Sequence, residues 1–177
     1  MTDPVSYRAM RRLSVDGVVV FANCAPLDSG HAFDRVFDAD VGTFCDLWGD
    51  ISGGDVKIGV DFGEASNYVG YVRAYPRRDE WFHRMIGMTL YGGNRDAEAE
   101  TSAQTKEGAD ALSSALSPIR SYTWNFLKAS DISKSMTAYR TYFVSDMTEG
   151  GGGNIAELEF YGWSKSDLPK PFYVIIR

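Results

Sequence analysis

The chain has 177 residues, of which 44% are hydrophobic and 14% aromatic, so it is long enough to bury the core of one ordinary domain. Its formal net charge of −6 argues against nucleic acid or an anionic membrane as the main partner, because both favour a basic surface. The 18 glycines, 10 Tyr and 10 Phe favour an all-β fold, in which aromatic side chains pack on pleated sheets and turns need positive φ angles.

The two cysteines, Cys24 and Cys45, are too few for a disulfide framework or a structural zinc site. They could pair in an oxidising compartment, although two small buried thiols are the favoured interpretation. No apolar run reaches the length of about 18 residues that a membrane helix needs, and the N-terminal residues lack the apolar segment of a signal peptide. We therefore expect no membrane partner.

Short apolar and aromatic segments separated by turn residues predict strands along the chain. Residues 56–62 alternate most clearly, because Lys57, Gly59 and Asp61 fall on the face opposite the apolar residues, which is typical of a half-buried strand. Residues 28–43 and 150–153 are expected to be loops. The expected strands are 18–23, 56–62, 68–75, 88–91, 122–128, 139–145, 155–161 and 172–176.

Residues 95–118 are the least strand-like segment, since they are rich in Ala, Ser, Asp and Glu. A weak periodicity at Ala111, Leu112, Ala115 and Leu116 predicts one short helix in an exposed excursion that is too polar to form a second core. We therefore expect one domain over residues 1–177, with its core at about 18–162 and with 163–177 as a C-terminal extension or edge strand. The many short strands predict an antiparallel sandwich.

Residues 36–47, VFDADVGTFCDL, bring Asp38, Asp40 and Thr43 into one short loop. Ca²⁺ takes six to eight oxygen ligands from carboxylates, hydroxyls and main-chain carbonyls, and such a loop can supply several of them. Alternatively, the aspartates accept hydrogen bonds from the amides of their own turn. The spacing alone leaves both interpretations open.

Several segments occur in an order that resembles the discoidin-like superfamily: FDADVGTF, VDFGE, VRAYPRRDEWFHRMIGMTLYGGN, AYRTYFVS and NIAELEFYG. This superfamily includes the coagulation factor V/VIII C-type domains and the family 32 carbohydrate-binding modules, and the resemblance runs over residues 18–162. It implies a galactose-binding-domain-like fold, an antiparallel jelly-roll sandwich of about eight main strands. It also implies a structural Ca²⁺ ion, which many members carry.

The resemblance implies that the ion links the early loop to the strand that begins near residue 155. The chain has alanine at position 39, where glycine is common in these proteins, so a positive φ angle there would be strained. The implied metal ligands are the carbonyls of Arg35, Asp40, Thr43 and Ala156, the carboxylates of Asp38 and Glu157, and the hydroxyl of Thr43.

A loop that begins after Pro76, with the sequence RRDEWFHR, is the candidate ligand-binding site. Sugar sites combine an aromatic face with groups that hydrogen-bond hydroxyls, and the resemblance implies that the arginine after the proline is a ligand contact. Trp81 is either part of the wall of the domain or a sugar platform, and Trp48 is either a core or a loop-tip residue. The expected ligand-binding residues are Asp46, Trp48, Arg77 and Trp81.

No catalytic motif is present: the chain lacks G-x-S-x-G, H-E-x-x-H and a phosphate-binding loop. Glu157 and Glu159 lie two residues apart on one strand and could imitate a glycosidase pair, but Glu157 is already implied as a metal ligand. We therefore do not expect an enzyme.

The expected function is that of a non-catalytic carbohydrate-binding module with a structural calcium ion. We expect an accessory domain of a larger secreted or cell-surface protein, a monomer or part of a multidomain chain. Its expected location is extracellular or at the cell surface, and its expected partner is a glycan of the galactose type. The alternative is a discoidin-type module for protein, cell-surface or membrane interaction, such as cell adhesion, without a sugar site.

Overall fold

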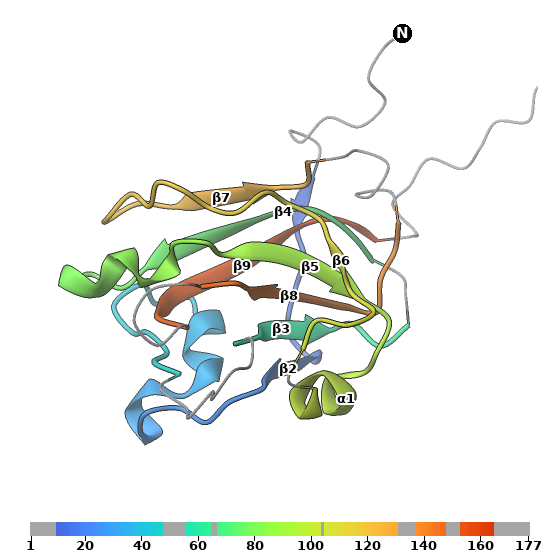
Figure 1. Ribbon diagram of the computed structural model, residues 1–177, viewed down its shortest axis with the longest axis horizontal. Coiled ribbons are helices and arrows are strands. Elements are labelled where there is room, and N and C mark those ends of the chain that lie inside the picture. Colours follow the sequence, from blue (N-terminus) through green and yellow to red (C-terminus); the bar gives the residue numbers. More distant parts are fainter. Residues whose placement is uncertain are drawn as a thin grey trace, which may run out of the picture.

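The computed structural model describes residues 10–47, 56–64, 67–103, 105–130, 137–147 and 153–164, which form two antiparallel sheets packed face to face (Figure 1). The helices are η2 (Ser29–His31), η3 (Phe33–Phe37), η4 (Glu80–Met85) and α1 (Ala97–Ser102). The strands are β1 (Arg11–Arg12), β2 (Val19–Ala22), β3 (Ile58–Asp61), β4 (Asn67–Pro76), β5 (Thr89–Gly93), β6 (Asp110–Ala111), β7 (Asn125–Lys128), β8 (Thr141–Ser145) and β9 (Ile155–Ser164).

The four-stranded sheet has the order β1-β9-β4-β7, and the five-stranded sheet has the order β2-β3-β8-β5-β6. The core lies between them, because alternate residues of each strand point inward. Val72 of β4, Leu127 of β7 and Phe160 of β9 meet Ile58 and Val144 of the other sheet, and all are at most 2% exposed. The expected all-β antiparallel sandwich is confirmed.

The expectation that β3 is half-buried is wrong, because its outer face is covered as well. Lys57 is fully buried, and its Nζ atom lies 2.7 Å from Oε2 of Glu100, which is 2% exposed on α1. Beside this ion pair, α1 places Ala97 on a small apolar cluster with Phe21 and Phe143. A buried charge is tolerated where it is paired. The polar residues that alternate along this strand therefore face a second buried layer, between the sheet and α1, rather than solvent.

The expected helix over residues 111–116 is also wrong. The helix of this region is α1, where the Asp96 side chain accepts a hydrogen bond from the Ala99 amide at 2.8 Å as its N-cap. Residues 111–116 instead run extended beside β5, with amide-to-carbonyl bonds of 2.8 Å from Leu112 to Leu90 and from Leu116 to Met88. Leu112 and Ser113 are buried against the sheet, whereas Ala111, Ser114 and Ala115 are exposed, so the segment is a partly buried sheet edge.

Some strand boundaries also differ from those predicted. β5 continues through Gly92 and Gly93, beyond the predicted end of the strand at residue 91, and a Cβ atom at Gly92 would lie only 2.5 Å from the Tyr139 ring. β7 begins at Asn125, because Tyr122 has a positive φ angle of 54° in the preceding turn. The predicted strand 172–176 and residues 150–152 lie outside the described residues, and the short strand β1 was not predicted.

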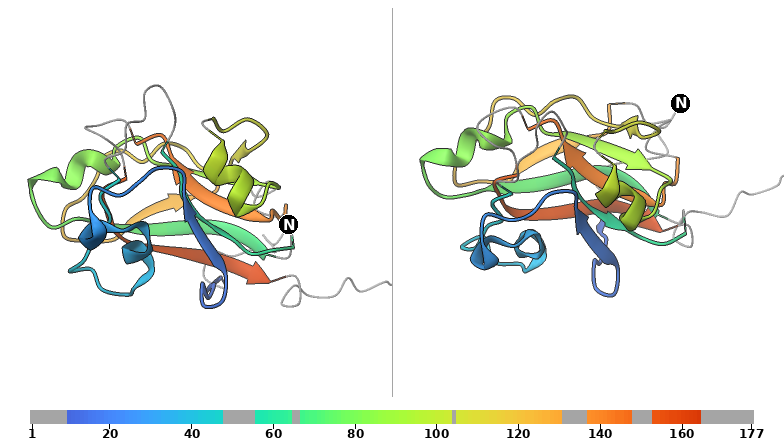
Figure 2. Two further views of the ribbon diagram at one scale, coloured as in Figure 1. Left: turned by 90° about the horizontal axis from the view of Figure 1, so that it is seen from below. Right: turned by 60° about the horizontal axis from the view of Figure 1, so that its bottom comes forward.

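The helices η2, η3 and η4 gather at the end of the sandwich where β4 ends and β9 begins (Figure 2). This end carries the candidate functional residues.

Both cysteines are free thiols, Cys45 buried and Cys24 partly buried, in agreement with the favoured interpretation. No helix in the described part of the chain has the length and apolar character needed to cross a membrane.

We predict that Glu100→Gln destabilises the protein by about 3 kcal/mol or more, because Lys57 would keep a buried charge without its carboxylate. Chemical unfolding in urea measures the change. Glu98→Gln, on the exposed side of the same helix, is the matched control and should change the free energy of unfolding by less than about 0.5 kcal/mol. Equal effects of the two substitutions would contradict this role of the Lys57–Glu100 pair.

Candidate functional site

The site is built where the loop after η3 meets the start of β9. The Cys45 amide donates to the Ile155 carbonyl at 2.9 Å, and the Cys45 thiol donates to the Gly153 carbonyl at 2.8 Å. Burial raises the pKa of Cys45 to about 12, so this thiol is structural rather than reactive. On the other side, β4 ends at Pro76, which is paired with Ile155. This junction therefore brings three distant parts of the chain together.

The loop after η3 is a compact turn closed by its own side chains. Asp38 accepts a hydrogen bond from the Asp40 amide at 2.9 Å, and Asp40 accepts one from the Gly42 amide at 2.8 Å. The Thr43 hydroxyl lies 2.8 Å from Asp38 Oδ2 and 2.9 Å from the Asp40 carbonyl oxygen. The aspartates therefore accept hydrogen bonds from the amides of their own turn, as one of the two alternatives from the sequence predicts. The same bonds bring oxygens of Asp38, Asp40 and Thr43 together, which the other alternative, a Ca²⁺ site, requires.

Glu157 of β9 is the most unusual carboxylate of the site. It is 1% exposed, and neither of its side-chain oxygens has a hydrogen-bond partner within the described part of the chain. Burial and then the negative charge of Asp38 raise its pKa to about 7, while the charge of Arg12 and the nearby Ala39 amide, which does not reach hydrogen-bond geometry, lower it only in part. A buried carboxylate without donors is costly unless a proton or a cation neutralises it.

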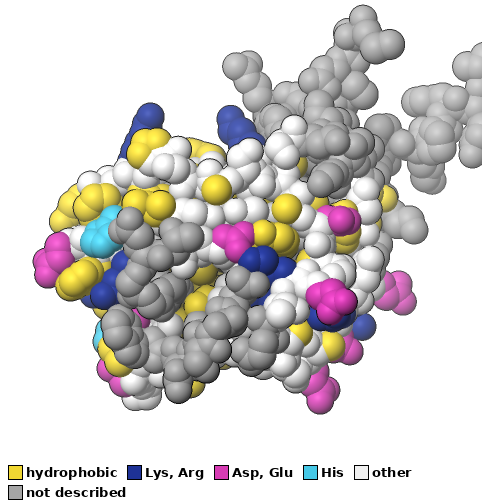
Figure 3. All heavy atoms as spheres, viewed as in Figure 1, with side chains coloured by type: hydrophobic (Ala, Val, Ile, Leu, Met, Phe, Trp, Pro, Cys, Tyr) yellow, Lys and Arg dark blue, Asp and Glu magenta, His cyan; other side chains and the backbone are white. Residues whose placement is uncertain are grey.

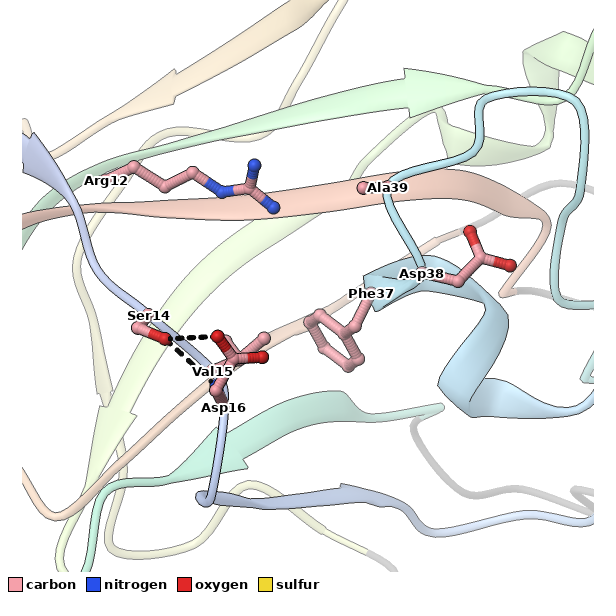
Figure 4. Close-up of a pocket in the computed structure, with 7 residues that line it drawn as sticks. All are labelled: Arg12, Ser14, Val15, Asp16, Phe37, Asp38 and Ala39. Carbon is pink, nitrogen blue, oxygen red and sulfur yellow. Dashed lines mark hydrogen bonds between the residues drawn. The ribbon is translucent and has the colours of Figure 1, made fainter.

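Backbone strain accompanies this carboxylate. Ala39 has a φ angle of 62°, so the strain expected if this alanine had a positive φ angle is present. This conformation costs an alanine roughly 1 kcal/mol relative to glycine. Figure 4 shows Arg12 extending toward Ala39 across a hollow of about 460 Å³ between the β1–β2 segment and the loop. The hollow is lined by Arg12, Ser14, Val15, Asp16, Phe37, Asp38 and Ala39.

These residues fit a hard cation better than a transition metal. No group of three or more His, Cys, Asp or Glu side chains is arranged around a metal position in the described residues. Asp38 and Glu157 alone supply carboxylates, so a cation here would depend on hydroxyl and carbonyl oxygens, which Ca²⁺ accepts. Of the other predicted ligands, Arg35 lies in η3 with its side chain 3.7 Å from Asp38, and Ala156 is buried in β9 next to Glu157.

The second cluster centres on Arg77, directly after β4. Its Nη1 donates to Asn154 Oδ1 and lies 3.1 Å from Asp46 Oδ2, and its Nε donates to Asp79 Oδ2 at 2.8 Å. The Arg77 and Asp46 side chains are only 11% and 7% exposed. The structure therefore brings the two predicted ligand-binding residues Asp46 and Arg77 into contact. The bonds to Asn154 and Asp79 fix the orientation of the Arg77 guanidinium.

Two aromatic rings border this cluster. The Arg77 guanidinium lies over the Phe44 ring at 4.1 Å, and the ring of His31 lies 4.7 Å from that of Phe44. The His31 carbonyl accepts a hydrogen bond from the Asp46 amide at 3.1 Å, so η2 is tied to the same site. The cluster thus combines an aromatic ring, a histidine, an arginine and an amide, which are the groups that bind sugar rings and hydroxyls.

Asp79 connects Arg77 to the predicted residue Trp81. It caps η4 by accepting from the Trp81 amide at 3.0 Å. Burial alone would raise the pKa of Asp79, but the bonds from Arg77 and the Trp81 amide outweigh it and lower the pKa. Trp81 is 40% exposed, with the Arg84 guanidinium 4.2 Å from its ring centre, so it is a surface residue rather than a core residue. Trp48 lies outside the described residues.

Figure 3 shows hydrophobic, cationic, anionic and histidine side chains mixed at the end of the molecule that carries η4. Asn154, Phe44 and His31 of this end were missed in the sequence. Asn154 could have been suspected from the sequence, because it is a polar residue directly before the β9 strand. No sequence pattern identifies Phe44 and His31, because their positions near Arg77 depend on how separate loops fold.

The two glutamates of β9 do not form an acid–base pair. Glu159 accepts from Arg73, from Tyr161 at 2.8 Å and from Arg12, whose Nη1 lies 3.1 Å away. Burial alone would raise the pKa of Glu159, but these donors lower it. Glu159 is therefore an ionised member of an ion-pair network, whereas Glu157 is buried beneath the loop after η3.

Comparison with known proteins finds no matching family model and no matching curated protein. Solved structures do match. The CBM62 module of Clostridium thermocellum Xyl5A is 26% identical, with a TM-score of 0.66 over 88% of this chain and 99% of the module. The family 32 carbohydrate-binding module of Clostridium perfringens NanJ, solved with galactose, is 11% identical, with a TM-score of 0.58 over 86% of this chain and 98% of the module.

An F5/8 type C domain from Bacteroides fragilis is 10% identical, with a TM-score of 0.62 over 88% of this chain and 97% of that domain. The chain therefore has the galactose-binding-domain-like fold that carbohydrate-binding modules and F5/8 type C domains share. This confirms the resemblance found in the sequence at the level of the fold.

The raised pKa of Glu157 predicts a pH-dependent stability in protein treated with EDTA. The pKa of Glu157 is about 7 in the folded state, above its ordinary value of 4.5, so the folded state binds the proton more tightly than the unfolded state. The free energy of unfolding should therefore be highest below pH 4.5 and fall as the pH rises from 4.5 through 7. The loss should be on the order of 3 kcal/mol and should disappear in Glu157→Gln, as measured by urea unfolding at several pH values. Glu98→Gln should keep the wild-type dependence, and a flat wild-type profile would contradict the prediction.

Proposed function

We propose that this protein is a non-catalytic carbohydrate-binding module that binds a galactose-type sugar at the Arg77 cluster. The observation that carries the proposal is the contact of Arg77 with Asp46, Asn154 and Phe44. The cluster is partly exposed at its aromatic edge and fixed at its polar base, so it needs little reorganisation to bind a ligand. The similarity to a family 32 module solved with galactose supports the choice of sugar.

Each group of the cluster has a role in this proposal. Phe44 and Trp81 would contact the C–H surface of the sugar, and Arg77 would donate to ring hydroxyls. Asp46 and Asp79 orient the Arg77 guanidinium through charge-assisted hydrogen bonds. Asn154 is fully buried; it accepts from Arg77 through Oδ1 and its amide nitrogen lies 3.4 Å from Asp46 Oδ1, so it fixes the positions of both side chains.

The proposal includes a structural Ca²⁺ ion between the loop after η3 and β9. Its support is the buried Glu157 carboxylate, which lacks donors and lies under the negative charge of Asp38. The ligands would be the Asp38 and Glu157 carboxylates, the Thr43 hydroxyl, and the carbonyls of Arg35, Asp40, Thr43 and Ala156. The ion would neutralise Glu157 and hold Phe44 and Asp46, which follow the loop directly, in place for the sugar.

The setting of the module is part of the same proposal. The similar structures include carbohydrate-binding modules of larger proteins, one of them crystallised together with the M60 catalytic domain of Clostridium perfringens ZmpB. We infer an extracellular or cell-surface location and a position beside a further domain, where the module would hold its host protein near a glycan.

Galactose binding should depend on Arg77. We expect Arg77→Ala to weaken binding about tenfold or more, because the loss of a charge-assisted donor costs on the order of 1.5–3 kcal/mol. Isothermal titration with galactose measures the effect. Arg78→Ala, at the exposed neighbouring position, is the matched control and should bind as wild type.

Arg77→Lys keeps the charge but loses the planar fork, so it should also bind poorly while remaining folded. If neither galactose nor a glycan array gives binding, and a liposome or protein pull-down depends on Trp81 instead, the sugar assignment is wrong and the interaction-module alternative holds.

Calcium should stabilise the fold. We expect 1 mM CaCl₂ to raise the melting temperature of EDTA-treated protein by roughly 5 °C or more, because an ion bound only by the folded state shifts the unfolding equilibrium. Asp38→Ala should abolish this response, whereas Asp34→Ala, an exposed acid in η3 outside the predicted ligand set, should retain it. Differential scanning calorimetry of the three proteins decides the matter, and an unresponsive wild type would contradict the calcium site.

A further inference from the structure

Tyr122, in the turn before β7, combines an exposed ring with a strained backbone. Its side chain is 64% exposed, the highest value among the large hydrophobic residues of the described chain. Its φ angle of 54° lies in the left-handed region, which glycine or asparagine would adopt at little cost but a bulky residue rarely does. Burial of the ring does not offset this strain, and strain that persists in a folded chain often accompanies function.

The turn that carries Tyr122 is held firmly from both sides. From inside, the buried Asn125 side chain accepts from the Arg120 amide at 2.8 Å and donates to the carbonyls of Arg120 and Thr123 at 2.9 and 3.1 Å. From outside, the Tyr122 hydroxyl donates to the Arg78 carbonyl at 2.6 Å. The exposed ring is therefore fixed before any ligand arrives, so binding costs little conformational entropy.

The anchor point of the Tyr122 hydroxyl is directly beside the Arg77 cluster. Arg78 follows Arg77 in the chain, with Cα atoms about 3.8 Å apart. The next residue, Asp79, accepts from Arg77 at 2.8 Å and from the Trp81 amide at 3.0 Å. One short segment, residues 77–81, therefore connects the arginine of the proposed galactose site to the two exposed aromatic residues Trp81 and Tyr122.

The strand pairing places this turn at the same end of the molecule as the Arg77 cluster. Because Ala74 of β4 is opposite Asn125 of β7, the turn before β7 lies beside the end of β4. Figure 1 shows the turn before β7 and η4 projecting at the same end. The rings of Tyr75 and Trp124 meet at 5.4 Å beneath the turn and support its base.

The groups around the Tyr122 ring are those that bind a sugar. Ser121 and Thr123 are exposed on either side of Tyr122, and hydroxyl groups both donate and accept hydrogen bonds. A sugar ring presents the complementary combination, a C–H surface for an aromatic ring and hydroxyls for the polar neighbours. The turn therefore suits a neutral sugar.

We propose that Tyr122 forms a second sugar subsite, for the sugar to which a terminal galactose is attached. The inference rests on the proposed galactose site and defines its ligand as a galactose-ended oligosaccharide rather than free galactose. The terminal galactose would occupy the Arg77 cluster, and the C–H face of the next sugar would lie on the Tyr122 ring. The bond from Tyr122 to Arg78 keeps the position of this ring constant relative to the cluster.

The test compares galactose with neutral disaccharides that end in galactose, namely lactose, melibiose and the galactobioses, by isothermal titration. At least one disaccharide should bind about fivefold more tightly than galactose, the gain expected from one aromatic contact. Tyr122→Gly removes the ring and adopts the positive φ angle without strain, so it should abolish this gain and leave the affinity for galactose unchanged. Tyr122→Phe keeps the ring and loses only the bond to Arg78, so its affinity for the disaccharide should lie between those of the wild type and Tyr122→Gly.

Phe126→Ala removes another exposed ring, 50% exposed on β7, and should keep the full gain as the matched control. The proposal is overturned if no disaccharide binds more tightly than galactose, if the gain survives Tyr122→Gly, or if Tyr122→Gly weakens galactose equally. Equal effects of Tyr122→Phe and Tyr122→Gly would also overturn it, because the hydroxyl would then only hold the turn. A protein that binds galactose without any gain refutes the second subsite alone, whereas one that binds none of these sugars refutes the galactose site as well.

Discussion

The antiparallel pairing of β4 with β9 is the interaction on which the polar chemistry of this protein depends. It pairs Pro76 with Ile155, so that Arg77, which leaves β4, meets Asn154, which precedes β9. The same register places Tyr71 beside Tyr161 and Arg73 beside Glu159 on the outer face of the sheet. A shift of one residue would turn these side chains into the core, so one register decides both the loop cluster and the outer face of the four-stranded sheet.

The buried Glu157 carboxylate links this pairing to the loop after η3. A sandwich has no structural need for an acid that is 1% exposed and lacks donors, and Ala39 adds local backbone strain beside it. The strain and the unpaired charge lie in one place, directly before the segment that supplies Phe44 and Asp46 to the Arg77 cluster. A cation there would therefore serve the stability of the fold and the shape of the loop site together.

The loop cluster and the outer faces of the two sheets differ in physical character. The Arg77 cluster is formed by loops and by an arginine that several acceptors orient, which suits a compact sugar. The outer rings of the four-stranded sheet, Tyr71, Phe126 and Tyr161, lie instead in a connected row on regular strands. The five-stranded sheet has used its outer aromatic residues to pack α1 instead.

The sequence alone determined the all-β class and most of the strands, because apolar alternation and ordered motifs are local signals. It named Asp46 and Arg77 as separate candidates for ligand binding, and the structure added the contact between them. It did not predict α1, the extended path of residues 111–116 or the buried Lys57–Glu100 pair, because those depend on what the other sheet leaves uncovered. Only the tertiary structure brought Asn154, Phe44 and His31 to Arg77 and placed Glu157 under Asp38 without a donor. Such contacts join distant parts of the chain, for example 77 positions apart for Arg77 and Asn154 and 108 for Asp46 and Asn154, and no local pattern encodes them.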